Sequence, residues 1–162
     1  MRGYAHFTSV RQPPELVWRA LTRREWLERW YALEASIDAR AGGRLVLKLR
    51  DGRRRDAVID VIDEPRRMRL IFDPDAEFTA AGGRKAGFGP VTEDLLIDAK
   101  PDRTVVRVLG NGVPDDSAFD PYHTRLRSSW TYWLDTLRRL LEQADPAAGA
   151  PPERRSRTRP AQ

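Results

Sequence analysis

DPYHTRLRSSWTYWLDTLRRLLEQA, residues 120–144, is the most regular part of this sequence. Its large apolar residues recur every three or four positions, which is the period of an α-helix with one apolar face. They are Leu126, Trp130, Trp133, Leu134, Leu137 and Leu141. Because Asp120 is a good N-cap and Pro121 a good first helical residue, we predict a helix from Tyr122 to Ala144. At about 1.5 Å per residue it would be about 34 Å long, enough to cross a whole sheet.

The residues before this helix alternate between apolar and polar in short runs, as the strands of a half-buried sheet do. The predicted strands cover residues 4–11, 44–50, 57–63, 68–72, 91–100 and 104–109. Asp51-Gly52 predicts a hairpin turn between two of them. Strands that precede one long amphipathic helix predict an α+β fold in which the helix lies on one face of an antiparallel sheet.

Two short helices are predicted after the first strand. Residues 15–21 follow a pair of prolines and have apolar side chains on one face. Thr22 and Glu25 match a capping box, so we predict that they start the second helix. Residues 73–90, DPDAEFTAAGGRKAGFGP, are predicted to form one long glycine-rich connection, and loops of that length are usually functional or mobile.

The composition predicts one domain and a tail. The chain has 162 residues, a formal net charge of +5 and 40% hydrophobic residues, and we assign residues 1–144 to a single domain. Residues 145–162 are rich in proline, alanine and arginine, so we predict that they are disordered. Arg53-Arg54-Arg55 follows a turn, where charge runs are usually solvated. Because no aromatic-interleaved basic motif accompanies it, we expect no nucleic-acid partner.

The residue types that are scarce exclude several kinds of site. The absence of cysteine excludes disulfides and thiolate metal sites. The two histidines, His6 and His123, are far apart in the sequence, so we predict no metal site and no cofactor. No apolar run approaches about 18 residues, so we expect no membrane span. The first residues lack the apolar core of a secretory signal, so we expect a cytoplasmic protein.

Four segments resemble a known family. They are PPELVWRALTRREWLERWYA (13–32), AGGRL (41–45), RTVVRVLGNGVP (103–114) and HTRLRSSWTYWLDTLRRLLE (123–142). On these segments the chain resembles the Hsp90-ATPase-activator-homologue branch of the START/Bet v 1-like (SRPBCC, polyketide cyclase-like) superfamily. The resemblance implies a helix-grip fold, in which a curved antiparallel sheet wraps around the long C-terminal helix. Two short helices would close one end, and a cavity would lie between sheet and helix.

The resemblance implies a range of functions. Members of the superfamily include binders of lipophilic ligands and polyketide aromatase/cyclases, and one subgroup resembles the self-resistance proteins encoded beside enediyne antibiotics such as calicheamicin. This chain departs from common members at the end of the strand after Thr104. A histidine often stands there, and Gly110 stands there in this chain. We expect its missing side chain to enlarge the cavity or loosen the strand end; glycine in a strand often marks a close approach of another group.

The residues predicted to contact a ligand in that cavity come from several elements. They are Trp30, Phe72, Phe78, Phe88, Glu93, Val108, Gly110, Trp130, Trp133 and Leu134. Trp130 and Trp133 face the sheet by helical spacing, either as core residues or as a stacking platform for a flat ligand. Phe78 and Phe88 lie in the glycine-rich connection, either as a small cluster beneath it or as part of a lid over the cavity mouth.

Glu93 is the polar exception on the apolar face of its strand, which it shares with Val91, Leu95 and Ile97. A buried carboxylate is costly without a partner. Glu93 therefore either leans into water at the strand start, near the cavity rim, or is a polar anchor or a general acid–base inside the cavity.

The leading hypothesis is that the chain binds a hydrophobic, polycyclic aromatic small molecule in an internal cavity. By resemblance this ligand is a secondary metabolite, and the role is sequestration, transport or antibiotic self-resistance. The alternative is an enzyme of the polyketide cyclase/dehydratase type that uses Glu93. A third hypothesis is a module that interacts with a chaperone. We expect a monomer or a weak homodimer.

Overall fold

The computed structural model describes residues 1–80, 82–147 and 149–154. In this part of the chain, strands form one antiparallel seven-stranded sheet in the order β1-β7-β6-β5-β4-β3-β2. The strands are β1 (Arg2–Val10), β2 (Glu34–Ile37), β3 (Arg44–Lys48), β4 (Arg54–Asp63), β5 (Arg67–Phe72), β6 (Val91–Ala99) and β7 (Thr104–Val113). The helices are α1 (Pro14–Thr22), α2 (Arg24–Trp30), α3 (Pro74–Ala80) and α4 (Asp120–Glu142), with a 3₁₀ turn η1 (Ser117–Phe119).

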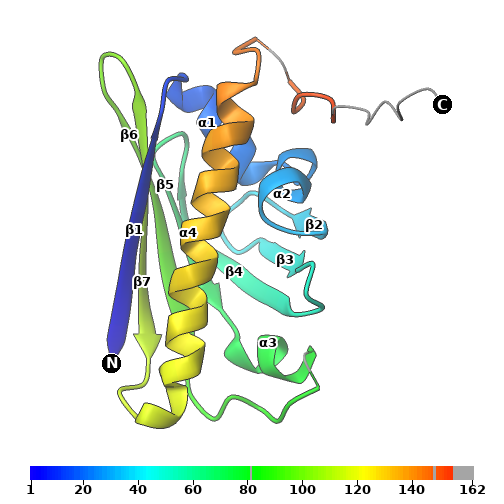
Figure 1. Cartoon of the computed structure of the whole chain (residues 1–162), viewed down its shortest axis with the longest axis vertical. Coiled ribbons are helices and arrows are strands. Elements are labelled where there is room, and N and C mark those ends of the chain that lie inside the picture. The colour runs from blue at the N-terminus through cyan, green and yellow to red at the C-terminus, as the bar shows by residue number, and fades with distance from the viewer. Residues whose placement is uncertain (81, 148, 155–162) are drawn as a thin grey trace, which may run out of the picture.

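The long helix α4 runs along one face of the sheet, as predicted (Figure 1). Helices α1 and α2 lie beside its C-terminal half and α3 lies near its N-terminal end. The buried residues of α4 recur with the helical period: Tyr122, Leu126, Trp130, Trp133, Leu134, Leu137, Leu140 and Leu141. The fold is therefore the α+β helix grip, with the core between α4 and the sheet.

Several local predictions are wrong. Thr22 does not cap α2: it is the last residue of α1, and its hydroxyl donates a hydrogen bond of 2.7 Å to the Trp18 carbonyl one turn back. Residues 74–80 of the expected loop form α3, because acidic residues in its first turn and Pro74 at its start favour a helix there. Asp120 is the first residue of α4 rather than its N-cap, since η1 precedes it.

The ends of α4 are held by side chains from distant parts of the chain. At the C-terminal end, Gln12 Nε2 donates hydrogen bonds to the carbonyls of Leu141 (2.8 Å) and Ala144 (3.1 Å). At the N-terminal end, the Asp120 carboxylate pairs with the Arg2 guanidinium of β1. These contacts satisfy carbonyls that a helix end leaves unpaired and place a negative charge at the positive end of the dipole.

The residues after α4 turn towards α2. Trp26 Nε1 donates to the Gly149 carbonyl at 3.5 Å, and the Arg29 guanidinium donates to the Pro152 carbonyl. Residue 148 and residues 155–162 of the predicted disordered tail (145–162) lie outside the described residues, so for them disorder stays a prediction. No helix in the described part of the chain is both long and apolar enough to cross a bilayer.

Candidate functional site

A cleft of about 540 Å³ opens between α2, the β3–β4 turn and α4. The predicted hairpin turn at Asp51-Gly52 is present, and Gly52 adopts a φ of 88° that favours glycine. The α2 side contributes Arg29, Trp30 and Tyr31; the turn contributes Leu49, Arg50, Asp51 and Arg53; and α4 contributes Ser128, Ser129, Tyr132, Trp133 and Thr136. The cleft is therefore built from three segments that are far apart in the sequence.

The wall of the cleft is aromatic. Ring centroids lie 4.8 Å apart for Trp30 and Tyr31 and 4.6 Å apart for Tyr31 and Trp133. Tyr132 stands at the mouth with 65% of its surface exposed. On α4 the lining residues Ser129, Tyr132, Trp133 and Thr136 have the spacing of one helical face, so the helix period that builds the core also builds this wall.

The rim of the cleft is charged. Asp51 accepts a hydrogen bond of 2.6 Å from Arg53 Nε and one of 3.0 Å from the Arg53 backbone. Partial burial would raise the pKa of Asp51, but the hydrogen bonds and charge of Arg53 outweigh burial and hold this pKa below its ordinary value. Asp51 is therefore a fixed carboxylate that positions Arg53.

Behind the aromatic wall, a buried ion pair joins β4 to β6, and a hydrogen bond from Trp130 connects it to α4. Arg55 of β4 and Glu93 of β6 are 1% and 0% exposed, and Arg55 Nη2 lies 3.0 Å from Glu93 Oε2. Trp130 Nε1 donates to the same oxygen at 2.8 Å and Tyr4 Oη donates to it at 2.5 Å. Arg55 also donates to the hydroxyl of Tyr31, which links the pair to the cleft wall.

Apolar rings surround the Arg55 guanidinium. Its central carbon lies 3.8 Å from the ring centre of Phe72 and 5.7 Å from that of Trp133. Burial would lower the pKa of Arg55, but the Glu93 carboxylate raises it well above its ordinary value. Arg55 therefore remains charged, and the pair fills the space between sheet and helix where the sequence predicted an open cavity.

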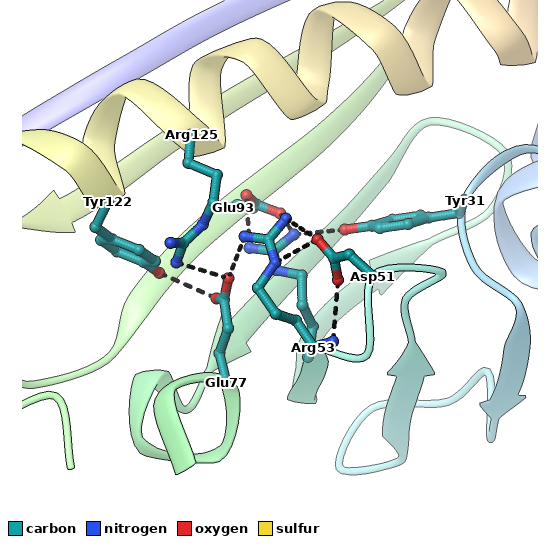
Figure 2. Close-up of polar contacts among 8 residues, drawn as sticks. Tyr31, Asp51, Arg53, Glu77, Glu93, Tyr122 and Arg125 are labelled. Atoms are coloured by element: carbon teal, nitrogen blue, oxygen red, sulfur yellow. Dashed lines mark hydrogen bonds and ion pairs between the residues drawn. The ribbon is translucent and has the colours of Figure 1, made fainter. Parts of the chain in front are cut away.

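A second buried carboxylate lies next to this pair. Glu77 of α3 is 3% exposed and its Oε1 lies 3.3 Å from Arg53 Nη1 and 3.5 Å from Arg125 Nη2. Tyr122 Oη donates to Glu77 Oε2 at 3.5 Å. Figure 2 shows Arg125 and Tyr122 reaching from α4 to Glu77, while Arg53 approaches from the β3–β4 turn. Through Arg53, the rim of the cleft is connected to α3.

Gly110 marks a close approach of another group, as glycine in a strand often does, and not the enlarged cavity that we also expected. A Cβ at Gly110 would lie 2.0 Å from Tyr4 Cζ, far closer than any real contact. Gly110 pairs with Tyr4 on one side and with Glu93 on the other in the sheet register. The missing side chain therefore makes room for the Tyr4 ring, which reaches Glu93, and does not enlarge a cavity.

The structure separates the predicted ligand-contacting residues into groups. Of these residues, only Trp30 and Trp133 line the cleft. Phe72 and Glu93 contact Arg55, and Trp130 donates a hydrogen bond to Glu93. The position of Glu93 at a rim is wrong, because it lies in the interior. Val108 and Leu134 are core residues.

Phe78 and Phe88 lie elsewhere, in a small aromatic cluster with Tyr122 and Phe119. Ring centroids are 5.1 Å apart for Phe78 and Tyr122 and 4.9 Å apart for Phe88 and Phe119. Of the two predicted alternatives, this is the small cluster beneath the glycine-rich connection. These rings do not line the cleft.

Sequence reasoning missed Arg55, Tyr31 and Tyr4. The prediction that Arg55 belongs to a solvated charge run is wrong, because β4 begins at Arg54 and the Arg55 side chain lies on the buried face of this strand. A signal was present: Arg55 shares strand parity with Ala57 and Ile59, both buried apolar residues. Among the described residues, no three His, Asp or Glu side chains gather in a way that could hold a metal ion.

The buried phenols give a test of this interior. Burial raises the pKa of Tyr4, Tyr31 and Tyr122, with Glu93 adding to the shift of Tyr4 and Glu77 to that of Tyr122. Below about pH 10 all three phenols are protonated in both states, so their full contribution to stability is present. At higher pH the unfolded chain loses these protons while the folded chain keeps them, so stability falls as pH rises.

We therefore expect these three phenols to ionise only together with unfolding. Ultraviolet absorbance of phenolate, followed beside near-ultraviolet circular dichroism during an alkaline titration, measures both events. In concentrated urea the same phenols should ionise at their ordinary pKa of about 10. Ionisation of all three near that pH in a chain that keeps its native dichroism would contradict their burial.

Comparisons with solved structures support the fold. Protein MLL2253 from Mesorhizobium loti superposes with a TM-score of 0.75 at 18% identity, covering 89% of this chain and 99% of that protein. The Aha1 dimer from Colwellia psychrerythraea gives 0.72 at 17% identity, with 88% and 98% covered. DynU16, described as a putative protein in the dynemicin biosynthetic locus, gives 0.70 at 18% identity, with 89% of this chain but 48% of DynU16 covered.

At such identities these likenesses establish the fold alone. A comparison with curated proteins finds no significant match. A family model described as "Activator of Hsp90 ATPase homolog 1-like protein" matches residues 11–142, most of the chain. The chain therefore belongs to the Activator of Hsp90 ATPase homolog 1-like family, in the START/Bet v 1-like superfamily that its helix-grip fold represents.

Proposed function

We propose that this protein binds a hydrophobic, flat aromatic small molecule in the cleft between α2, the β3–β4 turn and α4. The observation that carries the proposal is the gathering of Trp30, Tyr31, Tyr132 and Trp133 around a space of about 540 Å³. Sites for small ligands usually measure about 300–1,000 Å³ and are lined by aromatic side chains with a few polar groups. Rings stack in offset or edge-on contacts, which suits a polycyclic ligand.

The finer part of the proposal is that the ligand is a secondary metabolite and that the role is sequestration, transport or self-resistance. The resemblance of the sequence to enediyne self-resistance proteins supports it. So does the likeness in fold to DynU16, which is described as a putative protein in the dynemicin biosynthetic locus. We propose a monomer or a weak homodimer in a cytoplasmic location; the Aha1 neighbour is described as a dimer.

A polyketide cyclase that uses Glu93 has less support. Its Oε2 already receives hydrogen bonds from Tyr4 and Trp130, and Arg55 pairs with both oxygens. A general acid–base has to reach the substrate within about 3 Å, directly or through one water. Because Glu93 is not among the residues lining the cleft, we favour binding over catalysis.

A chaperone-binding module would need an apolar patch on the outer face of the sheet. Phe7 of β1 and Leu109 of β7 are exposed there, and two strands, β6 and β5, separate Val58 of β4 from β7. The Arg107 guanidinium lies 6.0 Å from the Phe7 ring centre and covers part of it. Scattered exposed apolar residues of this kind are normal on a protein surface.

Titration with N-phenyl-1-naphthylamine, a neutral polycyclic probe, tests the proposal. We expect saturable quenching of tryptophan fluorescence and a rise in probe emission. Tyr132→Ala should weaken binding roughly 3- to 10-fold, because one aromatic contact at the mouth is lost. Tyr132 is largely exposed, so this change should leave the melting temperature nearly unchanged.

Phe7→Ala is the matched control, because Phe7 is 70% exposed and lies on the outer face of β1, away from the cleft. It should bind the probe as the unchanged protein does. Quenching that never saturates would contradict the proposed function. An equal loss of affinity in the two variants would contradict the proposed location.

A further inference from the structure

The cleft carries more positive than negative charge. Arg29, Arg50 and Arg53 line it, and Asp51 is the carboxylate that lines it. Arg53 is neutralised locally, because its guanidinium lies 2.6 Å from Asp51 and 3.3 Å from the buried Glu77. The net positive charge of the cleft therefore comes from the other two arginines, Arg29 and Arg50.

Among the described residues, the hydrogen-bond partners of Arg29 and Arg50 are backbone carbonyls, and neither arginine forms an ion pair with a carboxylate. Arg50 Nη2 donates to the backbone carbonyl of Glu28 at 3.5 Å, and Arg29 donates to that of Pro152. A guanidinium has five N–H donors, so each keeps donors free while held in place by a neutral acceptor. Their positive charges are available to a ligand.

The polar side chains that α4 contributes to the cleft are uncharged. Ser128 and Ser129 of α4 line the cleft together with the two arginines. The Thr136 hydroxyl is already engaged, since it donates to the Tyr132 carbonyl at 2.9 Å. The cleft thus combines a ring-lined wall with a positively charged rim, and this combination matches a molecule with a flat apolar body and one anionic group.

We propose that the cleft selects aromatic anions: flat ring systems that carry a carboxylate, sulfonate or phosphate held by Arg29 and Arg50. This rests on the proposed function and specifies its ligand class. The guanidinium is the side chain best suited to such groups, because its planar fork can donate two parallel hydrogen bonds to one oxyanion. The rings of the ligand pack against the aromatic wall of the cleft, while its anionic group stays at the hydrated rim.

Two probes that differ by one group test this inference. 8-Anilinonaphthalene-1-sulfonate is N-phenyl-1-naphthylamine with a sulfonate added, so the ring systems are matched. We expect the anionic probe to bind roughly 10-fold tighter or more at low salt, and this preference to shrink as salt screens the rim. Arg29→Gln and Arg50→Gln should each weaken the anionic probe roughly 3- to 10-fold and leave the neutral probe unchanged.

Arg103→Gln is the control, because Arg103 is an exposed arginine in the β6–β7 turn and does not line the cleft. It should affect neither probe, which separates a local contact from a change in net charge. Melting temperatures of all three variants establish that they are folded. Tyr132→Ala should weaken both probes, because both use the aromatic wall.

The outcomes distinguish the two proposals. Equal affinities for the two probes, or equal losses in the two arginine variants for both probes, would overturn the anion preference and leave the proposed binding site standing. A loss of the anionic probe in Arg103→Gln as large as in Arg50→Gln would also overturn it. Failure of both probes to bind would overturn the proposed function itself.

Discussion

Replacing Glu93 with glutamine is expected to lower the free energy of unfolding by about 3–5 kcal/mol. The substitution keeps the shape of the side chain and an acceptor for Tyr4 and Trp130, but it leaves the Arg55 charge buried without a counter-charge. Arg55 is only 1% exposed and is stacked against Phe72, so it cannot turn to water. Urea denaturation followed by circular dichroism measures the loss.

Two further variants isolate the cause. Arg55→Met combined with Glu93→Gln removes the unpaired charge, so we expect the double variant to be more stable than Glu93→Gln alone. Glu34→Gln breaks an exposed pair with Lys48, 3.2 Å apart, and should cost less than about 1 kcal/mol. A double variant less stable than the single one would refute the view that the isolated charge is the penalty.

Truncation of Trp133 to alanine is the second change with a large expected effect, a loss of about 3–5 kcal/mol. Trp133 is 7% exposed and its ring packs edge-on against Trp130 at 5.1 Å. The truncation leaves a hole between α4 and Tyr31, and the surrounding rings cannot fully collapse into it. Chemical denaturation measures the change in stability.

The neighbouring residue provides the control. Tyr132 precedes Trp133 on α4 but is 65% exposed, so Tyr132→Ala should change the stability by less than about 1 kcal/mol. If both truncations cost the same, the register of α4 on the sheet would be wrong by one position.

Local periodicity explains why most of the fold could be predicted. The spacing of the tryptophans and leucines in α4 specified which face meets the sheet. The alternation in β6 placed Glu93 on the same face as Leu95 but left open whether its carboxylate reaches water. The strand β2 was missed because its four residues, EASI, are too short for a period to emerge. Helix α3 was missed because it has only seven residues and a glycine-rich stretch typical of a loop follows it.

The candidate site was predicted less well, because it depends on contacts between distant residues. Arg55 and Glu93 are 38 positions apart, and nothing local in the Arg53-Arg54-Arg55 run indicates that its last member has a buried acidic partner. The open cavity was predicted wrongly for the same reason. Whether the space between sheet and helix is empty depends on which side chains from distant parts of the chain fill it. Only the three-dimensional register brings Arg55, Tyr4 and Trp130 to one carboxylate.

Because the Tyr4 ring occupies the space next to Gly110, substitutions at these two positions depend on each other during evolution. A side chain at position 110 and an aromatic ring at position 4 would occupy the same space, so a single change at Gly110 has to pass through a strained intermediate unless Tyr4 shrinks first. Shrinking Tyr4 in turn takes away one of the hydrogen bonds that Glu93 receives. Family members that have histidine at the position equivalent to Gly110 should therefore have a small residue at the position equivalent to Tyr4. An alignment of such relatives should show that the two positions change together.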